Sequence, residues 1–177
     1  QRVVIAANII GKMPKGDRGT RKKADPLTGA RKKVIFKEGT AKENVDKLVE
    51  ALKSDGYDFT VGIDINTPIP KADRVVSVGK GIGEKKNMEL AKALAIQAGA
   101  AIGSSRPVAE TMKYVPLNRY VGMSGQKFNG NLYIACGISG AGQHLKGIKD
   151  ATTIVAINNN PNAPIFKNAD YGIVGDL

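Results

Sequence analysis

The chain of 177 residues is 42% hydrophobic and 24% charged, a composition that is typical of a globular domain and excludes a low-complexity chain. The single cysteine, Cys136, excludes an intrachain disulfide and fits a reducing compartment such as the cytoplasm. No apolar run reaches the roughly 18 residues that a membrane-spanning helix needs. The net charge is +11, and residues 1–40 carry most of it, with eleven Lys and Arg against three Asp and Glu.

Residues 1–70 are predicted to form a basic arm and linker with two short strands and one helix. The strands are expected at "RVVIAA" (2–7) and "KKVIFK" (32–37), and the Gly, Pro and Asp residues between them favour a loop. The segment "AKENVDKLVEALKSDG" (41–56) has apolar residues at helical spacing and ends in glycine, which predicts a helix. Pro68 and Pro70 mark a linker, so a domain boundary is placed near residue 71.

Residues 71–177 alternate between apolar strands and helices. Strands are expected at "RVVSVG" (74–79), "AAIG" (100–103), "RYVGMSG" (119–125), "LYIACG" (132–137), "TTIVAIN" (152–158) and "YGIVG" (171–175). Helices are expected at "GEKKNMELAKALAIQAG" (83–99) and from the start of "SGAGQHLKGI" (139–148). Apolar strands that alternate with helices predict a doubly wound parallel α/β sheet with helices on both faces.

The basic arm has three possible interpretations. It is a solvated loop, a docking element for an acidic partner, or a nucleic-acid-binding segment. The arm lacks the interleaved aromatic residues on which bases would stack, which disfavours nucleic acid.

Ligands of such sheets bind beyond the carboxyl ends of the strands. Five of these ends carry small, polar or charged residues: "VGKGIG" (78–83), "GSSRPVAE" (103–110), "VGMSGQ" (121–126), "GISGAGQH" (137–144) and "INNNPNAPIF" (157–166). If these segments lie along one edge of the sheet, they line one crevice.

The segment "GISGAGQH" has the residue types of an anion site. Its glycines let backbone N–H groups approach an anion, and the start of a helix adds a favourable dipole. Ser139 can donate to a phosphate oxygen, while His144 either faces the same ligand or packs as an ordinary histidine. Arg106 is either a surface arginine or a cation for a phosphate or an electron-rich ring. Because the chain has only one histidine and one cysteine, we expect no dedicated metal site.

The same segments carry a resemblance to a known family. The stretch from "LYIACGISGAGQH" through "IVAIN", "APIF" and "ADYGIVGD" is similar to the C-terminal FAD-binding domain of the electron transfer flavoprotein alpha subunit. The earlier blocks "VVSVGKGIG", "GSSRPVAE" and "VGMSGQ" match that family in the same order. The resemblance covers residues of about 71–177 and implies a Rossmann-like domain that holds FAD.

The resemblance also implies where FAD would lie. Arg106 and Ser124 fall at the flavin ring, and His144 falls near its C2 carbonyl. Asn158 and Asp176 fall at the adenosine end. The residues near the pyrophosphate are Ser105, Gly137, Ser139, Gly140 and Gln143. Met123 and Gly125 complete the implied cofactor-binding set, and Met123 stands where the family usually has glutamine.

The function that the resemblance implies is an electron carrier, not an enzyme that transforms a substrate. It would pass electrons from flavin dehydrogenases to a downstream acceptor, together with an electron transfer flavoprotein beta subunit. Its expected location is the cytoplasm or, in a eukaryote, the mitochondrial matrix, with no membrane span and no nucleic acid. Two alternatives are a regulatory module that binds another adenine dinucleotide in the same crevice and a nucleic-acid binder that uses the basic arm.

Overall fold

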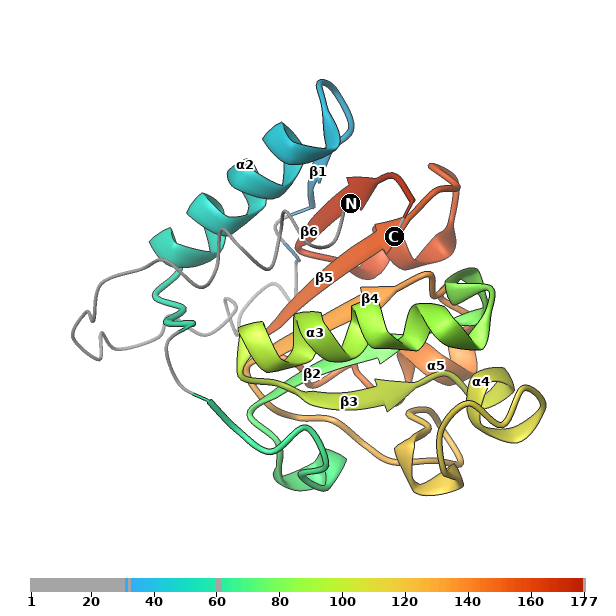
Figure 1. The fold of residues 1–177 in the computed structure, drawn as a ribbon. Coiled ribbons are helices and arrows are strands. Elements are labelled where there is room, and N and C mark those ends of the chain that lie inside the picture. The colour runs from blue at the N-terminus through green and yellow to red at the C-terminus, as the bar shows by residue number, and fades with distance from the viewer. Residues whose placement is uncertain (1–30, 32, 60–61, 177) are drawn as a thin grey trace.

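The computed structural model describes residues 31, 33–59 and 62–176. They form one sheet of six strands in the order β1-β6-β5-β4-β2-β3, and every neighbouring pair is parallel (Figure 1). The strands are β1 (Val34–Phe36), β2 (Arg74–Val78), β3 (Ala101–Ser104), β4 (Leu132–Cys136), β5 (Thr153–Asn158) and β6 (Tyr171–Val174). The helices are α2 (Ala41–Ser54), α3 (Met88–Ala98), α4 (Arg106–Glu110) and α5 (Gly142–Leu145).

Five short 3-10 helices complete the described elements: η1 (Ile69–Lys71), η2 (Lys80–Ile82), η3 (Lys85–Asn87), η4 (Leu117–Arg119) and η5 (Pro164–Asn168).

Local sequence explains where α2 begins and where α3 ends. Thr40 and Glu43 form a capping box that starts α2, and each satisfies a backbone N–H of the other. Gly99 ends α3 in the left-handed conformation, with φ of 58°.

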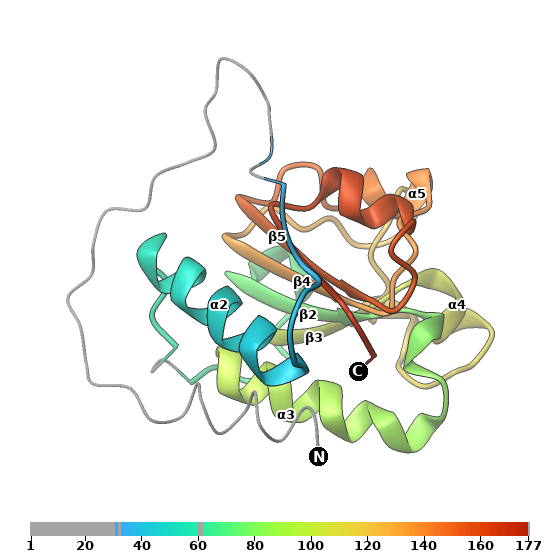
Figure 2. The same ribbon diagram turned by 90° about the horizontal axis from the view of Figure 1, so that it is seen from above.

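Helices cover both faces of the sheet, as predicted. Figure 2 shows α2 and α3 on one side, with α5 and the 3-10 helix η5 on the other. The strand residues alternate between the two apolar layers. On β4, for example, Leu132, Ile134 and Cys136 pack into the α2/α3 layer, whereas Tyr133 and Ala135 pack into the opposite layer. All five residues of β4 are buried, which explains its continuous apolar sequence.

Strand β1 belongs to the same sheet as the later strands, although it comes from the segment predicted as arm and linker. It pairs with β6, where Val34 is opposite Tyr171 and Phe36 is opposite Ile173. The division of the chain near residue 71 stays a prediction. The predicted strand at residues 2–7 and the basic arm up to residue 30 lie outside the described residues.

One predicted strand is wrong. Residues 119–125 form a tight loop that makes only isolated bridges, from Ser104 to Tyr120 and from Val121 to Gln126. The backbone turns back on itself because the N–H of Gln126 donates to the carbonyl of Tyr120, at 2.9 Å. A methyl group on Gly125 would lie 2.3 Å from the Tyr120 ring, so this turn requires glycine.

The chain reverses its direction of progress across the sheet between β2 and β4. After β2 it passes through α3 to β3 on one side, and after β4 it continues through α5 to β5 on the other. The connections that follow β2 and β4 therefore lead to opposite sides of the sheet, and a crevice forms at this point. Within the part of the chain that the structure describes, no helix is both long and apolar enough to cross a bilayer.

Candidate functional site

A crevice with a volume of about 480 Å³ lies at the carboxyl ends of β2, β3, β4 and β5, over the point where the chain reverses. This volume is within the range of small-molecule sites. The lining residues come from five segments: Gly79, Lys80, Gly81, Ser105, Arg106, Pro107, Tyr120, Val121, Gly122, Met123, Ser124, Gly137, Ile138, Ser139, Ala141, Gln143, His144 and Asn158. The expectation that these strand ends share one edge is therefore met.

Glycines at the base of the crevice let the loops after β2 and β4 touch. A methyl group on Gly79 would lie 2.2 Å from the carbonyl oxygen of Gly137, and one on Gly81 would lie 2.8 Å from the Gly137 Cα. Gly137 itself has φ of 64°, and its carbonyl accepts the N–H of Gly81 at 3.0 Å. Gly79 and Gly81 of "VGKGIG" are thus needed for packing between the two loops at the base of the crevice.

The turn after β4 presents unpaired hydrogen-bond donors. Among the described residues, none accepts a hydrogen bond from the backbone N–H groups of residues 139–143. Ser105, which precedes α4 on the other side of the crevice, has a buried Oγ without a hydrogen-bond partner. Unpaired backbone N–H groups together with a free hydroxyl are suited to an anion such as a phosphate.

The imidazole of His144 is directed into the protein. His144 is only 7% exposed, and its Nε2 lies 3.0 Å from the hydroxyl of Tyr133 on β4. Its Nδ1 is buried and has no hydrogen-bond partner in the described structure. Burial lowers the pKa of His144 to about 4, so the imidazole is neutral at physiological pH. Burial also raises the pKa of Tyr133.

Arg106 stands at the lip of the crevice as the first residue of α4. Its guanidinium binds both carboxylate oxygens of Glu110, at 2.6 and 3.0 Å, and both side chains are about half exposed. This pairing raises the pKa of Arg106 and lowers the pKa of Glu110. Nearby, the hydroxyl of Tyr120 donates to Ser124 Oγ at 2.9 Å. The arrangement fixes the direction of a cation at the crevice mouth.

Nine of the twelve predicted site residues line the crevice, and three do not: Gly125, Gly140 and Asp176. Gly125 shapes the 120–126 loop, as described above. Gly140 has φ of 90°, and a methyl group there would lie 2.3 Å from the backbone N of Ile165. A glycine is therefore required at position 140, because the backbone packs against η5 there.

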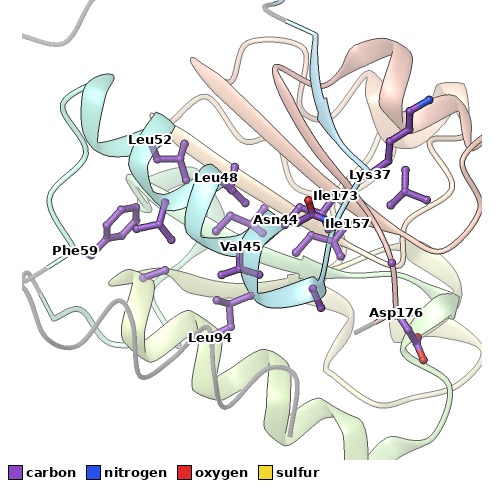
Figure 3. A pocket seen from close by; sticks show the side chains of 17 residues that line it. Lys37, Asn44, Val45, Leu48, Leu52, Phe59, Leu94, Ile157, Ile173 and Asp176 are labelled. Carbon is purple, nitrogen blue, oxygen red and sulfur yellow. The ribbon is translucent and has the colours of Figure 1, made fainter.

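Asp176 borders a second cavity of about 210 Å³ that lies between α2, α3 and the sheet. In Figure 3 the carboxylate of Asp176 lies at the opposite end of this cavity from Phe59. Apolar side chains such as Leu48 and Ile173 form most of the wall between them (Figure 3).

Three residues of the site region are absent from the predicted set. Lys80 lines the crevice and lies within "VGKGIG", a segment that the sequence singled out only for its glycines. Glu110 could have been found from its spacing of four residues from Arg106, which favours an ion pair on one helix turn. Tyr133 gave no signal, because it reads as one more apolar residue of β4.

The similarity to known proteins falls in the part of the chain that forms the crevice. Residues 68–149 match the family model described as "Electron transfer flavoprotein FAD-binding domain". The protein FixB of Salmonella typhimurium (strain LT2) is 54% identical over 108 residues, and that of Escherichia coli O9:H4 is 53% identical over 108 residues. In both alignments these residues are 61% of this chain and 34% of the relative.

The chain therefore spans about a third of the length of these relatives. The matched residues contain β2, β3, β4 and α5, which carry most of the crevice. The resemblance that the strand-end motifs indicated is confirmed over residues 68–149, which are similar to the electron transfer flavoprotein FAD-binding domain.

Proposed function

We propose that the crevice holds FAD without a covalent bond and that the protein works as an electron carrier. The observation that supports this most is the set of unpaired N–H groups of Ser139, Ala141 and Gln143, which line the same crevice as the free hydroxyl of Ser105. These donors stand at the strand-reversal point of a domain whose family binds FAD.

The phosphate end of the cofactor fits the donors that this chain supplies. The turn at residues 139–143 would hold the pyrophosphate by backbone N–H groups, and the Ser105 hydroxyl would donate from the opposite wall. Lys80 adds a positive charge at the same crevice. Asn158 would lie beside the adenosine end, where its Nδ2 is already held by the carbonyl of Ile138 at 3.0 Å.

The ring end of the cofactor would lie near Arg106 and Ser124. When bound, FAD supplies the electron-accepting ring. The guanidinium of Arg106 would stabilise the electron-rich reduced ring, and its pairing with Glu110 would limit how much charge it contributes. His144, being neutral, would contribute no charge to the ring. The protein would thus set the potential chiefly through the Arg106–Glu110 pair.

The partners follow from the family and are proposals for this chain. An electron transfer flavoprotein beta subunit would assemble with it, and dehydrogenases would deliver electrons to the bound flavin. The chain would transfer electrons without transforming a substrate of its own. A regulatory module that binds another adenine dinucleotide is the alternative, because the phosphate donors would serve any pyrophosphate.

The test separates these two functions by the cofactor itself. The purified chain should show visible flavin absorbance or acquire it on addition of FAD, and calorimetry should show tighter binding of FAD than of NAD. The released cofactor should be FAD by chromatography. If NAD binds as tightly as FAD, the electron-carrier proposal is wrong and the regulatory module is supported instead.

A further inference from the structure

A second hollow, lined mainly by basic residues, lies on the α5 side of the sheet. Its volume is about 380 Å³, and five of its nine lining residues are basic whereas none is acidic. The basic residues come from three separate segments: Arg31, Lys33, Lys146, Lys149 and Lys167. The apolar side chains of Leu145, Ile148 and Ile154 lie between them. The fold thus gathers positive charges that are distant in the sequence.

Most of these charges are not neutralised. Arg31 is paired with Asp170 at 3.0 Å, and Lys149 has only a long, exposed contact with Asp150 at 3.9 Å. Within the described ranges, no carboxylate lies at salt-bridge distance from Lys33, Lys146 or Lys167. Uncompensated charges on one surface produce a local positive potential that attracts anions.

Arg31 anchors the described end of the basic arm beside this hollow. Its guanidinium donates to the carbonyls of Ala151 at 2.9 Å and Lys149 at 3.1 Å, in addition to the Asp170 carboxylate. Because these bonds occupy Arg31, the lysines are the groups that a partner would meet. The hydrogen bonds of Arg31 hold the chain in place where the basic arm joins the sheet. Residues 1–40, which include this arm, carry a net charge of +8.

The hollow adjoins the lip of the crevice. Lys146 Nζ lies 3.8 Å from the Sδ of Met123, and Met123 lines the crevice with 57% of its surface exposed. Lys127 Nζ is bound to the carbonyls of Gly122 and Met123 from the same loop. A partner that covered the basic hollow would therefore come close to the crevice mouth.

We propose that Lys33, Lys146, Lys149 and Lys167 form a docking surface for an acidic protein partner. Lysine ammonium groups are mobile point charges, which suit the carboxylates of an acidic surface. Nucleic acid is the less suitable partner: the hollow has no aromatic side chain on which the bases of a single strand would stack, and its one arginine, which would bind a duplex phosphate, is already engaged by Asp170. This inference goes beyond the proposed electron carrier and does not depend on FAD.

The experiment measures binding of the full chain to two polyanions, fluorescein-labelled poly-L-glutamate and a labelled DNA duplex, by fluorescence anisotropy. The variant Lys146→Gln/Lys149→Gln/Lys167→Gln removes three charges from the hollow. The matched control Lys85→Gln/Lys86→Gln/Lys92→Gln removes three charges from η3 and α3, which do not line the hollow. The Lys-to-Gln changes on the exposed surface should leave thermal unfolding of both variants close to that of the parent.

We expect the hollow variant to lose about tenfold in affinity for poly-L-glutamate at low salt, and the control less than about twofold. The difference should shrink at about 150 mM salt, where the screening length falls to about 8 Å. Equal losses in both variants would overturn the proposal, because attraction would then follow net charge alone. Tighter binding of DNA than of poly-L-glutamate, lost in the hollow variant, would overturn it in favour of a nucleic-acid surface.

Discussion

Arg106 and Glu110 form a two-pronged ion pair across one turn of α4, with Nε and Nη2 of the arginine at 2.6 and 3.0 Å from the two carboxylate oxygens. The carboxylate fixes the plane of the guanidinium at the crevice lip, and it also offsets the positive charge. Both effects would act on the electron-rich ring of a reduced flavin in the same place. The pair therefore gives two substitutions with opposite expected signs.

Arg106→Ala should lower the flavin reduction potential, and Glu110→Gln should raise it. The first change removes a cation that favours the reduced ring, while the second removes the anion that offsets this cation. Each shift should stay below about 30 mV, which is a tenfold change in a two-electron equilibrium, because both side chains are half exposed and screened. Redox titration of the FAD-loaded variants measures both.

The control for this pair is Glu89→Gln. Glu89 is an exposed carboxylate on α3 that is paired with Lys92 at 2.7 Å, so the substitution removes the same charge from an element that does not line the crevice. Its potential should match that of the parent. If Glu110→Gln and Glu89→Gln shift the potential equally, Glu110 has no special relation to the ring site.

Ser105→Ala should weaken FAD binding without destabilising the free protein. The buried Ser105 hydroxyl has no partner in the described structure, so its removal costs the free protein no hydrogen bond. A hydroxyl that donates to a phosphate contributes about 1.5–3 kcal/mol to binding, which corresponds to a roughly ten- to hundredfold loss in affinity. Calorimetry with FAD and thermal unfolding of the free chain measure the two effects separately.

Ser104→Ala is the matched control for this experiment. Ser104 Oγ is also buried and unpartnered in the described structure, but Ser104 does not line the crevice. Its substitution should leave the affinity for FAD unchanged. A loss of affinity of the same size in both variants would mean that the hydroxyl of Ser105 does not contact the cofactor.

Gly140→Ala should destabilise the fold, whether or not FAD is bound. The added methyl would lie 2.3 Å from the backbone N of Ile165, in a residue whose φ is 90°. Backbone strain of this kind costs about 1–3 kcal/mol. Urea unfolding of the free protein should show this loss, and Gly142→Ala should not, because nothing lies within 4 Å of its added methyl. Unchanged stability of Gly140→Ala would contradict the packing against η5.

The sequence was sufficient for the strands of the sheet because each of them is a mostly apolar run. Those of β2 and β4 locate the two strands at the reversal point, and glycine-rich turns follow both. It was less informative for the site, where contacts between distant segments decide the roles. The contact of Gly140 with Ile165 and the hydrogen bond of His144 to Tyr133 depend on how η5 and β4 pack, which no local pattern encodes. The sequence predicts a strand at residues 119–125, where the structure has a loop. The hydrogen bond that closes this loop, from the N–H of Gln126 to the carbonyl of Tyr120, leaves no trace in the pattern of apolar residues.

The last prediction concerns the stability of the protein at acidic pH. Burial lowers the pKa of His144 from 6.5 to about 4 in the folded chain, so the unfolded chain binds a proton that the folded chain excludes. The contribution of His144 to stability is therefore complete above about pH 6.5 and is lost as the pH falls toward 4. The full loss is about 3 kcal/mol, from 1.36 kcal/mol for each pH unit between the two pKa values. Urea unfolding at several pH values measures this loss of stability.

Because His144 is the only histidine, His144→Gln should remove this part of the pH dependence and leave the part that comes from carboxylates. Its imidazole should also give a single NMR signal that titrates well below pH 6. A titration midpoint near 6.5, or an unchanged pH dependence in His144→Gln, would show that the imidazole is not buried against Tyr133.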